Sequence, residues 1–461
     1  MKRIIGLALT LLTFTSVAEG RELPPAPGQP RDFTLPARET LRLANGLSLT
    51  FIDYGSVPKV TVFAVVRTGN IDEGDSTWLA DVAVEMLKEG TATRSAADIA
   101  RTSASMGGAL GVGAGAEQTS VGISVLSEHA TEAAELVADV LRNPRFPESE
   151  LPRVLANFER NLSVARSEPD SIAGEALARL VYGGHPFGRV LPAPGQLESY
   201  DITSVRGFYE RNFGARRTHV YVAGRYDRAA LEAALRRAFG DWREGAPPSD
   251  LPPKASDVLQ LQLIDRPGAP QSSLRMAVAV PDPAAPLYFP TTLTNSLLGG
   301  TFGSRITTNL REDKGYSYSP DSSISARRGN ALWIMQAEIT AEHTAAALTE
   351  IFREIERLQH EPPTTEELDA IKRYRAGLFV IGNSSPNGVL GQLAFMNLHG
   401  LPQEFLTHWV ANIHAVTPQQ VTDIAQRFIL PARMTIVIVG DLMTMGEIVR
   451  ALPQLQGARM P

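Results

Sequence analysis

Apolar residues recur with helical spacing just before the first long glycine-containing turn of the chain. The set occupies positions i, i+3, i+4, i+7 and i+8: Leu79, Val82, Ala83, Met86 and Leu87. Asp75 or Ser76 is a suitable N-cap for this run, and Gly90 is a suitable residue after its end. The pattern therefore predicts an amphipathic helix whose polar face carries Asp81 and Glu85, one turn apart.

The order of patterns in the first half of the chain returns in the second half. Each half has a helical run that starts at a Glu-His pair, a second amphipathic helix after a proline, and a closing β-branched strand that ends on glycine. The three correspondences are 127–151 with 341–368, 152–163 with 369–379, and 218–224 with 434–440. With strands at 41–53, 60–67 and 118–125, this order predicts an α+β fold in two copies.

Proline-rich stretches separate the predicted parts. Residues 245–257 lack apolar periodicity and form the predicted linker, and residues 21–36 form a proline-rich N-terminal segment. We predict a first domain at 37–244 and a second at 258–461.

The first twenty residues have the composition of a secretory signal. Lys2 and Arg3 precede an apolar run from Ile4 to Phe14, which is too short to span a bilayer, although a retained anchor is an alternative. We expect an exported protein, in a bacterial periplasm. The chain has no cysteine, which excludes disulfides and thiolate chemistry. Its net charge is −6 and its sequence contains no basic cluster, which argues against a nucleic-acid-binding surface.

The sequence from Leu79 to Thr91 resembles the zinc helix of the pitrilysin, insulysin and mitochondrial processing peptidase family, whose motif is H-x-x-E-H. Asp81 and Glu85 stand at the positions of the two histidines, and Val84 stands at the position of the general base. Asn161 stands where the resemblance implies a third ligand. Valine accepts no proton from water, so we expect no metal in this chain. Two carboxylates at this spacing could still hold a hard cation weakly, but they more often form a solvated face.

The resemblance also implies the fold and a peptide-binding edge. It predicts two homologous α/β sandwich domains, each an antiparallel-rich sheet with helices on one face, that form half of a clamshell. Gly111 and Val112 replace the Asn-Ala pair of a substrate-binding edge strand. The glycines around them superficially suggest a nucleotide loop, but no acidic ribose partner follows.

The second half retains the family's other signature. Leu298 to Ile306 leads to Asn309 to Tyr318, and the resemblance implies that Arg311 and Tyr318 reach across a cavity to a zinc site. A guanidinium and a phenol are suitable donors to the oxyanion that water attack on a peptide creates. Alternatively, Arg311 is a cation at a helix end and Tyr318 is a packed aromatic residue.

From these features we predict a catalytically incomplete subunit of a two-chain zinc metallopeptidase. A homologous partner would bind zinc and peptide, and this chain would donate Arg311 and Tyr318, without a cofactor of its own. The alternatives are a non-proteolytic structural or peptide-binding protein of the same fold, and an independent enzyme with another metal arrangement. Neither the partner nor the peptide preference follows from the sequence.

Overall fold

The computed structural model describes residues 34–460, which belong to one compact unit. The predicted signal at 1–20 and residues 21–33 of the proline-rich segment lie outside the described residues. Within 34–460, no helix combines the length and the apolar composition that crossing a membrane requires.

The first half of the chain builds a six-stranded sheet in the order β1-β2-β6-β3-β5-β4. Neighbouring strands are antiparallel except for β2 and β6, which are parallel. The strands are β1 (Arg38–Arg42), β2 (Ser48–Asp53), β3 (Lys59–Val66), β4 (Gly111–Ala114), β5 (Thr119–Leu126) and β6 (Thr218–Gly224).

The single strand predicted at 41–53 is wrong, because β1 and β2 form a hairpin there. Asn45 and Gly46 form its turn, and Gly46 has φ 90°, a left-handed conformation that glycine adopts without a Cβ clash. The Asn45 amide donates to the carbonyls of Phe239 and Trp242, which ties the turn to the end of a helix.

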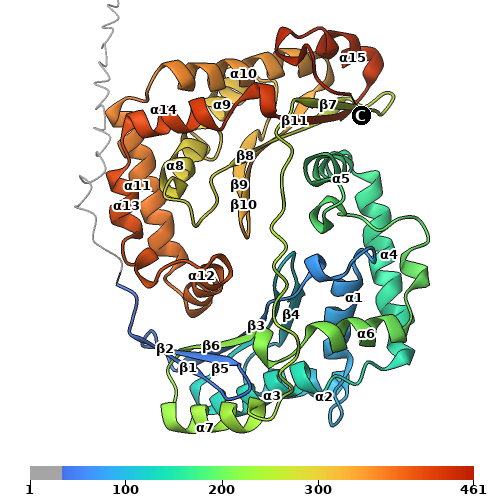
Figure 1. Cartoon of the computed structure of the whole chain (residues 1–461), viewed down its shortest axis with the longest axis vertical. Coiled ribbons are helices and arrows are strands. Elements are labelled where there is room, and N and C mark those ends of the chain that lie inside the picture. The colour runs from blue at the N-terminus through green and yellow to red at the C-terminus, as the bar shows by residue number, and fades with distance from the viewer. Residues whose placement is uncertain (1–33, 461) are drawn as a thin grey trace, which may run out of the picture. The chain divides into compact units, whose positions relative to one another are not determined.

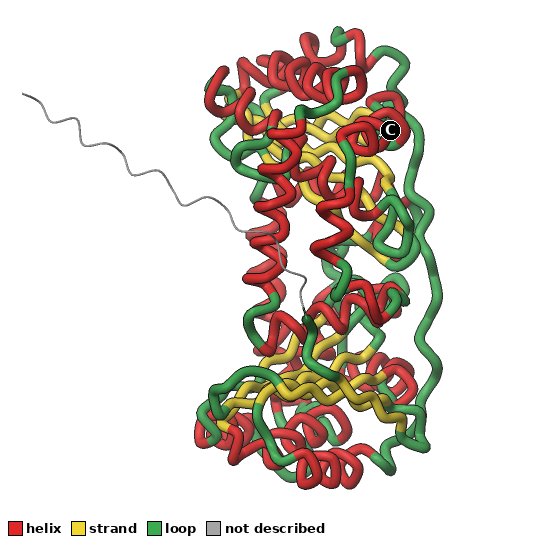
Figure 2. The backbone as a smooth tube through the Cα atoms, turned by 90° about the vertical axis from the view of Figure 1, so that its left-hand side faces the viewer, coloured by secondary structure: helices red, strands yellow, loops and turns green. Residues whose placement is uncertain are grey.

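The second half builds a five-stranded sheet in the order β7-β11-β8-β10-β9. Only the β7–β11 pair is parallel, which matches the single parallel pair of the first sheet. The strands are β7 (Gln260–Asp265), β8 (Gln271–Val280), β9 (Asp321–Arg327), β10 (Asn330–Thr340) and β11 (Thr435–Gly440). The two sheets appear as separate yellow layers in Figure 2.

Helices follow the strands in each half (Figure 1). Those of the first half are α1 (Leu79–Met86), α2 (Ala96–Ser105), α3 (Ala130–Arg142), α4 (Leu151–Ser167), α5 (Pro169–Tyr182), α6 (Ile202–Asn212) and α7 (Arg228–Phe239). Those of the second half are α8 (Tyr288–Leu298), α9 (Arg305–Thr307), α10 (Thr344–His360), α11 (Thr365–Gly382), α12 (Pro386–His399), α13 (Trp409–Ala415), α14 (Pro418–Arg427) and α15 (Leu442–Arg450). The predicted second helices correspond to α4 and α11, and both closing strands are confirmed.

Each sheet carries helices on both faces, and one helix of each half covers the sheet of the other half. Helix α5 packs on β8 and β11, and α12 packs on β3 and β6. The reason lies in the strands: β11 is buried at every position, so its second face also needs an apolar cover. Ala173 and Leu177 of α5 meet Val437 and Val439 of β11. The sequence predicted helices on one face of each sheet only. It did not predict that a helix of each half covers the sheet of the other half.

Candidate functional site

The degenerate helix α1 begins in a way that the sequence does not reveal. Neither Asp75 nor Ser76 caps it. The carboxylate of Glu73 instead accepts hydrogen bonds from the backbone N–H groups of Trp78 and Ala80, each at 3.1 Å. Trp78, the residue before the helix, has φ 69°, which is unusual for a bulky side chain. Burial raises the pKa of Glu73 to about 7, against the hydrogen bonds that favour its charged form.

Asp81 and Glu85 lie on the half-exposed face of α1 as predicted, but each already has a partner within the chain. The Asn70 amide donates to Asp81 at 2.7 Å, and the Lys88 ammonium pairs with Glu85 at 2.6 Å. Burial raises the pKa of Asp81. Each carboxylate is therefore held by a different side chain, an amide for Asp81 and an ammonium for Glu85.

The other two degenerate positions offer no ligand. Val84 is 1% exposed and belongs to the core of the first half. Asn161 is exposed on α4, whereas its neighbour Leu162 and, one turn earlier, Phe158 point into or against that core. In the part of the chain that the structure describes, no three His, Asp or Glu side chains group as metal ligands would. The residues present do not fit a zinc ion.

The glycine-rich strand β4 is an edge strand, since only β5 pairs with it. Gly111 pairs with Gly122 and Val112 with Val121. The other side of β4 has no strand among the described residues, which leaves its outward N–H and C=O groups available to another extended chain.

Arg311 and Tyr318 converge as the signature implies. The Arg311 guanidinium carbon lies 4.6 Å from the Tyr318 ring centroid and 4.4 Å from the Phe302 ring centroid, so the cation contacts two aromatic rings. Tyr318 is 77% exposed and Phe302 is 69% exposed. Gly315, at φ 66°, makes the left-handed exit predicted for it. Phe302 was missed as a partner, although its place in the Gly-Gly-Thr-Phe-Gly turn was visible in the sequence.

The segment that carries Arg311 is not the plain helix predicted at 304–313. One α-helical turn, α9, leads into a π-helical segment at Thr308–Asp313. Such wide turns are uncommon, and they redirect the side chains that follow them.

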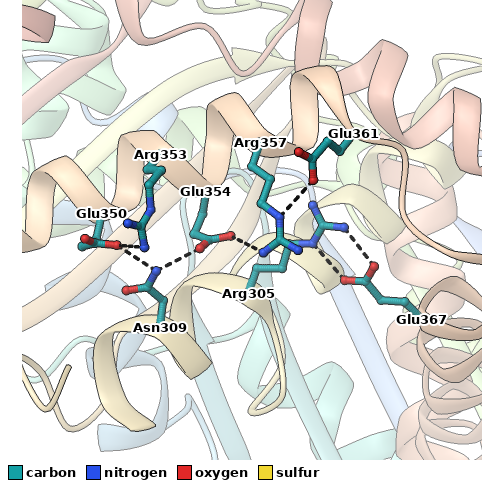
Figure 3. Close-up of polar contacts among 8 residues, drawn as sticks. All are labelled: Arg305, Asn309, Glu350, Arg353, Glu354, Arg357, Glu361 and Glu367. Carbon is teal, nitrogen blue, oxygen red and sulfur yellow. Dashed lines mark hydrogen bonds and ion pairs between the residues drawn. The ribbon is translucent and has the colours of Figure 1, made fainter. Parts of the chain in front are cut away.

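A network of charged groups fixes this π-helical segment to α10 and α11 (Figure 3). The buried Asn309 amide donates to Glu350 and to Glu354, both at 2.9 Å. Arg305 binds Glu367 through two hydrogen bonds of 2.9 Å, which is the geometry of a strong guanidinium–carboxylate pair. One anchor therefore holds α9 and the other holds the π-helical segment, and together they fix the backbone from which the Arg311 side chain projects.

The chain thus has the architecture of a two-sheet peptidase half whose metal-binding positions are altered. Comparison with known proteins agrees: the profile of "Insulinase (Peptidase family M16)" matches residues 53–195, and that of "Peptidase M16 inactive domain" matches residues 199–374. The chain belongs to the M16 peptidase family.

Its relatives are distant but extend over most of its length. An uncharacterised zinc protease of Mycobacterium leprae is 26% identical over 84% of this chain and 88% of the relative. One of Bacillus subtilis is 22% identical over 83% and 93%. The crystal structure of a peptidase M16 inactive domain from Pseudomonas fluorescens has TM-score 0.82 at 23% identity, covering 88% of this chain and 98% of that chain. A chain of Complex III2 from Candida albicans has TM-score 0.73 at 15% identity, covering 88% and 97%.

Proposed function

We propose that this chain is the zinc-free subunit of a two-chain M16 metallopeptidase. Its homologous partner binds zinc and activates water, and this chain completes the peptide chamber and donates Arg311 and Tyr318 to the partner's site. The observation that carries the proposal is the contrast between the two halves. The first half lacks ligands and base, whereas the second half presents a guanidinium and a phenol together on an exposed surface.

The chemistry assigned to the pair follows from the groups themselves. Both are hydrogen-bond donors, and the anchored segment keeps them in place before a substrate arrives. Donors that are preorganised around a developing oxyanion contribute to catalysis because no reorganisation is needed during the reaction. The substrates would be unfolded peptides, and the compartment would be the periplasm, as the N-terminal signal suggests.

One observation favours the alternative of a structural or peptide-binding protein. Arg311 already pairs with Glu312 at 3.2 Å and stacks on two rings, so its local interactions are sufficient without a substrate. The likeness to a chain of Complex III2 concerns the fold alone.

The test is peptide cleavage by the zinc-bearing partner mixed with wild-type chain, with Arg311→Ala or with Tyr318→Phe. Loss of one oxyanion donor is expected to lower kcat by about 100-fold. Tyr374→Phe and Arg225→Ala, at exposed positions, are the matched controls and should act as wild type. Equal cleavage with all variants would refute donation and favour the structural alternative. Stoichiometric zinc in the isolated chain, together with chelator-sensitive proteolysis, would refute the division of labour itself.

A further inference from the structure

A pocket of about 340 Å³ lies between the polar face of α1 and the second sheet. Asn70, Trp78 and Asp81 line it from the first half, and Ser325, Arg327 and Leu332 line it from β9 and β10. Helix α5 and the turn at Pro186–Gly188 close its sides. Its size is that of a small-ligand site, and its lining combines apolar walls with several polar and charged side chains, among them Asp81 and three arginines.

Trp78 forms one wall in a conformation that needs an explanation. A non-glycine residue with positive φ is strained, and such residues cluster at functional sites. The Glu73 carboxylate holds its backbone N–H, and its indole N–H donates to the Val190 carbonyl at 2.9 Å. The ring packs 6.0 Å from Phe158. These contacts keep a large aromatic surface against the pocket at a position where glycine, which has no Cβ, would have avoided the strain.

Arg327 is one of three arginines that line the pocket, and no carboxylate in residues 34–460 forms an ion pair with it. Its guanidinium donates to the carbonyl of the preceding residue, Ala326, at 3.2 Å, and its Nε is buried with no partner. Its guanidinium lies 5.3 Å from the Phe187 ring centroid. The pocket's other two arginines each have a carboxylate partner: Asp170 binds Arg275 through two hydrogen bonds. Arg189 pairs with Asp75 at 3.5 Å and donates to the carbonyls of Gly74 and Gly184.

Among the residues that the structure describes, the other carboxylates near the pocket do not accept a hydrogen bond from the Arg327 guanidinium. Glu117 is close enough for the charge of Arg327 to favour its ionised form, but its hydrogen bonds come from the backbone N–H of Arg328, and it forms none with Arg327. Asp81 accepts from Asn70. A buried guanidinium nitrogen without an acceptor is costly, and an anionic ligand would remove that cost.

We propose that this pocket binds an aromatic or aliphatic group that carries a carboxylate, such as the C-terminal residue of a peptide. The carboxylate pairs with Arg327, and the side chain lies among Trp78, Phe187 and Leu177. Asp81 can accept a hydrogen bond from the amide N–H of the same terminal residue, which a simple carboxylic acid lacks. The site belongs to this chain alone, so it is independent of the subunit role proposed above.

The test is calorimetric titration of the isolated chain with N-acetyl-alanyl-phenylalanine, its C-terminal amide and 3-phenylpropionate. The free carboxylate is expected to bind at least tenfold more tightly than the amide. Arg327→Gln should abolish this difference. Arg179→Gln, an arginine of α5 that binds Gln262 outside the pocket, should preserve it.

The three probes also separate the two sources of such a ligand. Tighter binding of the dipeptide than of 3-phenylpropionate supports a peptide terminus. Equal binding of both acids keeps the carboxylate site and overturns the role given to Asp81. Trp78→Gly suits the left-handed backbone and removes the wall, so a folded variant, checked by circular dichroism, should lose binding by at least tenfold. Equal affinity for acid and amide, or no binding of either at millimolar concentration, would overturn the proposal.

Discussion

The Arg311 guanidinium carbon lies 4.6 Å from the centre of the Tyr318 ring, although a π-helical turn and a left-handed glycine separate the two residues in sequence. The Phe302 ring centroid lies 4.4 Å from the same guanidinium carbon. The orientation of Arg311 thus depends on a second aromatic residue that lies outside the proposed donor pair.

This arrangement predicts a role for Phe302 that is separate from stability. Phe302→Leu removes one π face, so Arg311 gains rotational freedom, and cleavage by the two-chain enzyme should fall several-fold. Because the ring is 69% exposed, the free energy of unfolding should change by less than about 1 kcal/mol. Phe302→Trp keeps a π face and should retain activity. A Leu variant that cleaves as well as wild type would contradict this orientation role.

Replacement of Asn309 should lower the stability of the protein, because two carboxylates depend on its amide. Its amide serves two carboxylates, Glu350 and Glu354, and the second is buried. Asn309→Ala would leave Glu354 short of a donor in a dry site, which should lower the free energy of unfolding by about 2–3 kcal/mol. Urea unfolding followed by circular dichroism measures this change.

The matched control for this variant is Asn161→Ala. Asn161 is exposed on a helix and stands at a degenerate ligand position, so its replacement should change stability by less than about 0.5 kcal/mol. Similar losses in the two variants would mean that the amide of Asn309 contributes no more than a surface asparagine.

His219 predicts acid sensitivity of the contact between α12 and the first sheet. Its ring lies between the Thr50 hydroxyl at 2.7 Å and the Asn397 amide at 3.4 Å, and burial lowers its pKa to about 4. The unfolded chain, with a histidine pKa near 6.5, binds more protons between pH 4 and 6.5. Stability is therefore full above pH 6.5 and is lost as the pH falls through this window.

The expected loss between pH 7 and pH 5 is roughly 2 kcal/mol from His219, and His399, whose pKa burial also lowers to about 4, acts in the same direction. Glu73 acts in the opposite direction, since its raised pKa means that the folded state binds the extra proton between about pH 4.5 and 7. His219→Gln removes one titrating group. Urea midpoints at the two pH values should converge in this variant, and an unchanged pH dependence would contradict the assignment to His219.

Local patterns were enough to place most elements. The repeat of Glu-His helices and glycine-ended strands located both sheets, and the Gly315 exit was foreseen because only a residue without Cβ suits that turn. Contacts between distant segments were not foreseen. The Glu73 carboxylate caps α1 from five and seven residues away along the chain. Helices α5 and α12 each pack on the sheet of the other half, because both faces of the sheet strands are buried, and the periodicity of a strand does not tell which helix covers its second face. The π-helical turn has no periodic signal.

The candidate site shows the same limit. The convergence of Arg311 and Tyr318 was implied by a short motif whose spacing is local. The partners of Asp81 and Glu85, the burial of Val84 and the outward direction of Asn161 depend on how α1 packs against its neighbours. The pocket beside Trp78 is made by residues from both halves, so no stretch of sequence contains it.

Two ion pairs lie at the linker, residues 245–257, and they differ in burial. Arg217 and Asp72 form a salt bridge at 3.0 Å with side chains only 5% exposed, and Ser249 of the linker donates to the same carboxylate at 2.5 Å. Arg328 pairs with Asp250 of the linker, but both partners are far more exposed. Removing one member of a buried pair strands a charge away from water, whereas an exposed pair contributes little.

Arg217→Met should therefore lower the free energy of unfolding by about 3–5 kcal/mol and make the linker sensitive to proteolysis, because Asp72 is then an uncompensated anion beneath it. Arg328→Gln should cost less than about 1 kcal/mol and leave the linker resistant. Denaturant unfolding gives the first quantity, and timed digestion with mass spectrometry of the fragments gives the second. The buried pair does not hold the linker in place if Arg217→Met has wild-type stability, or if the linker is cleaved in Arg328→Gln alone.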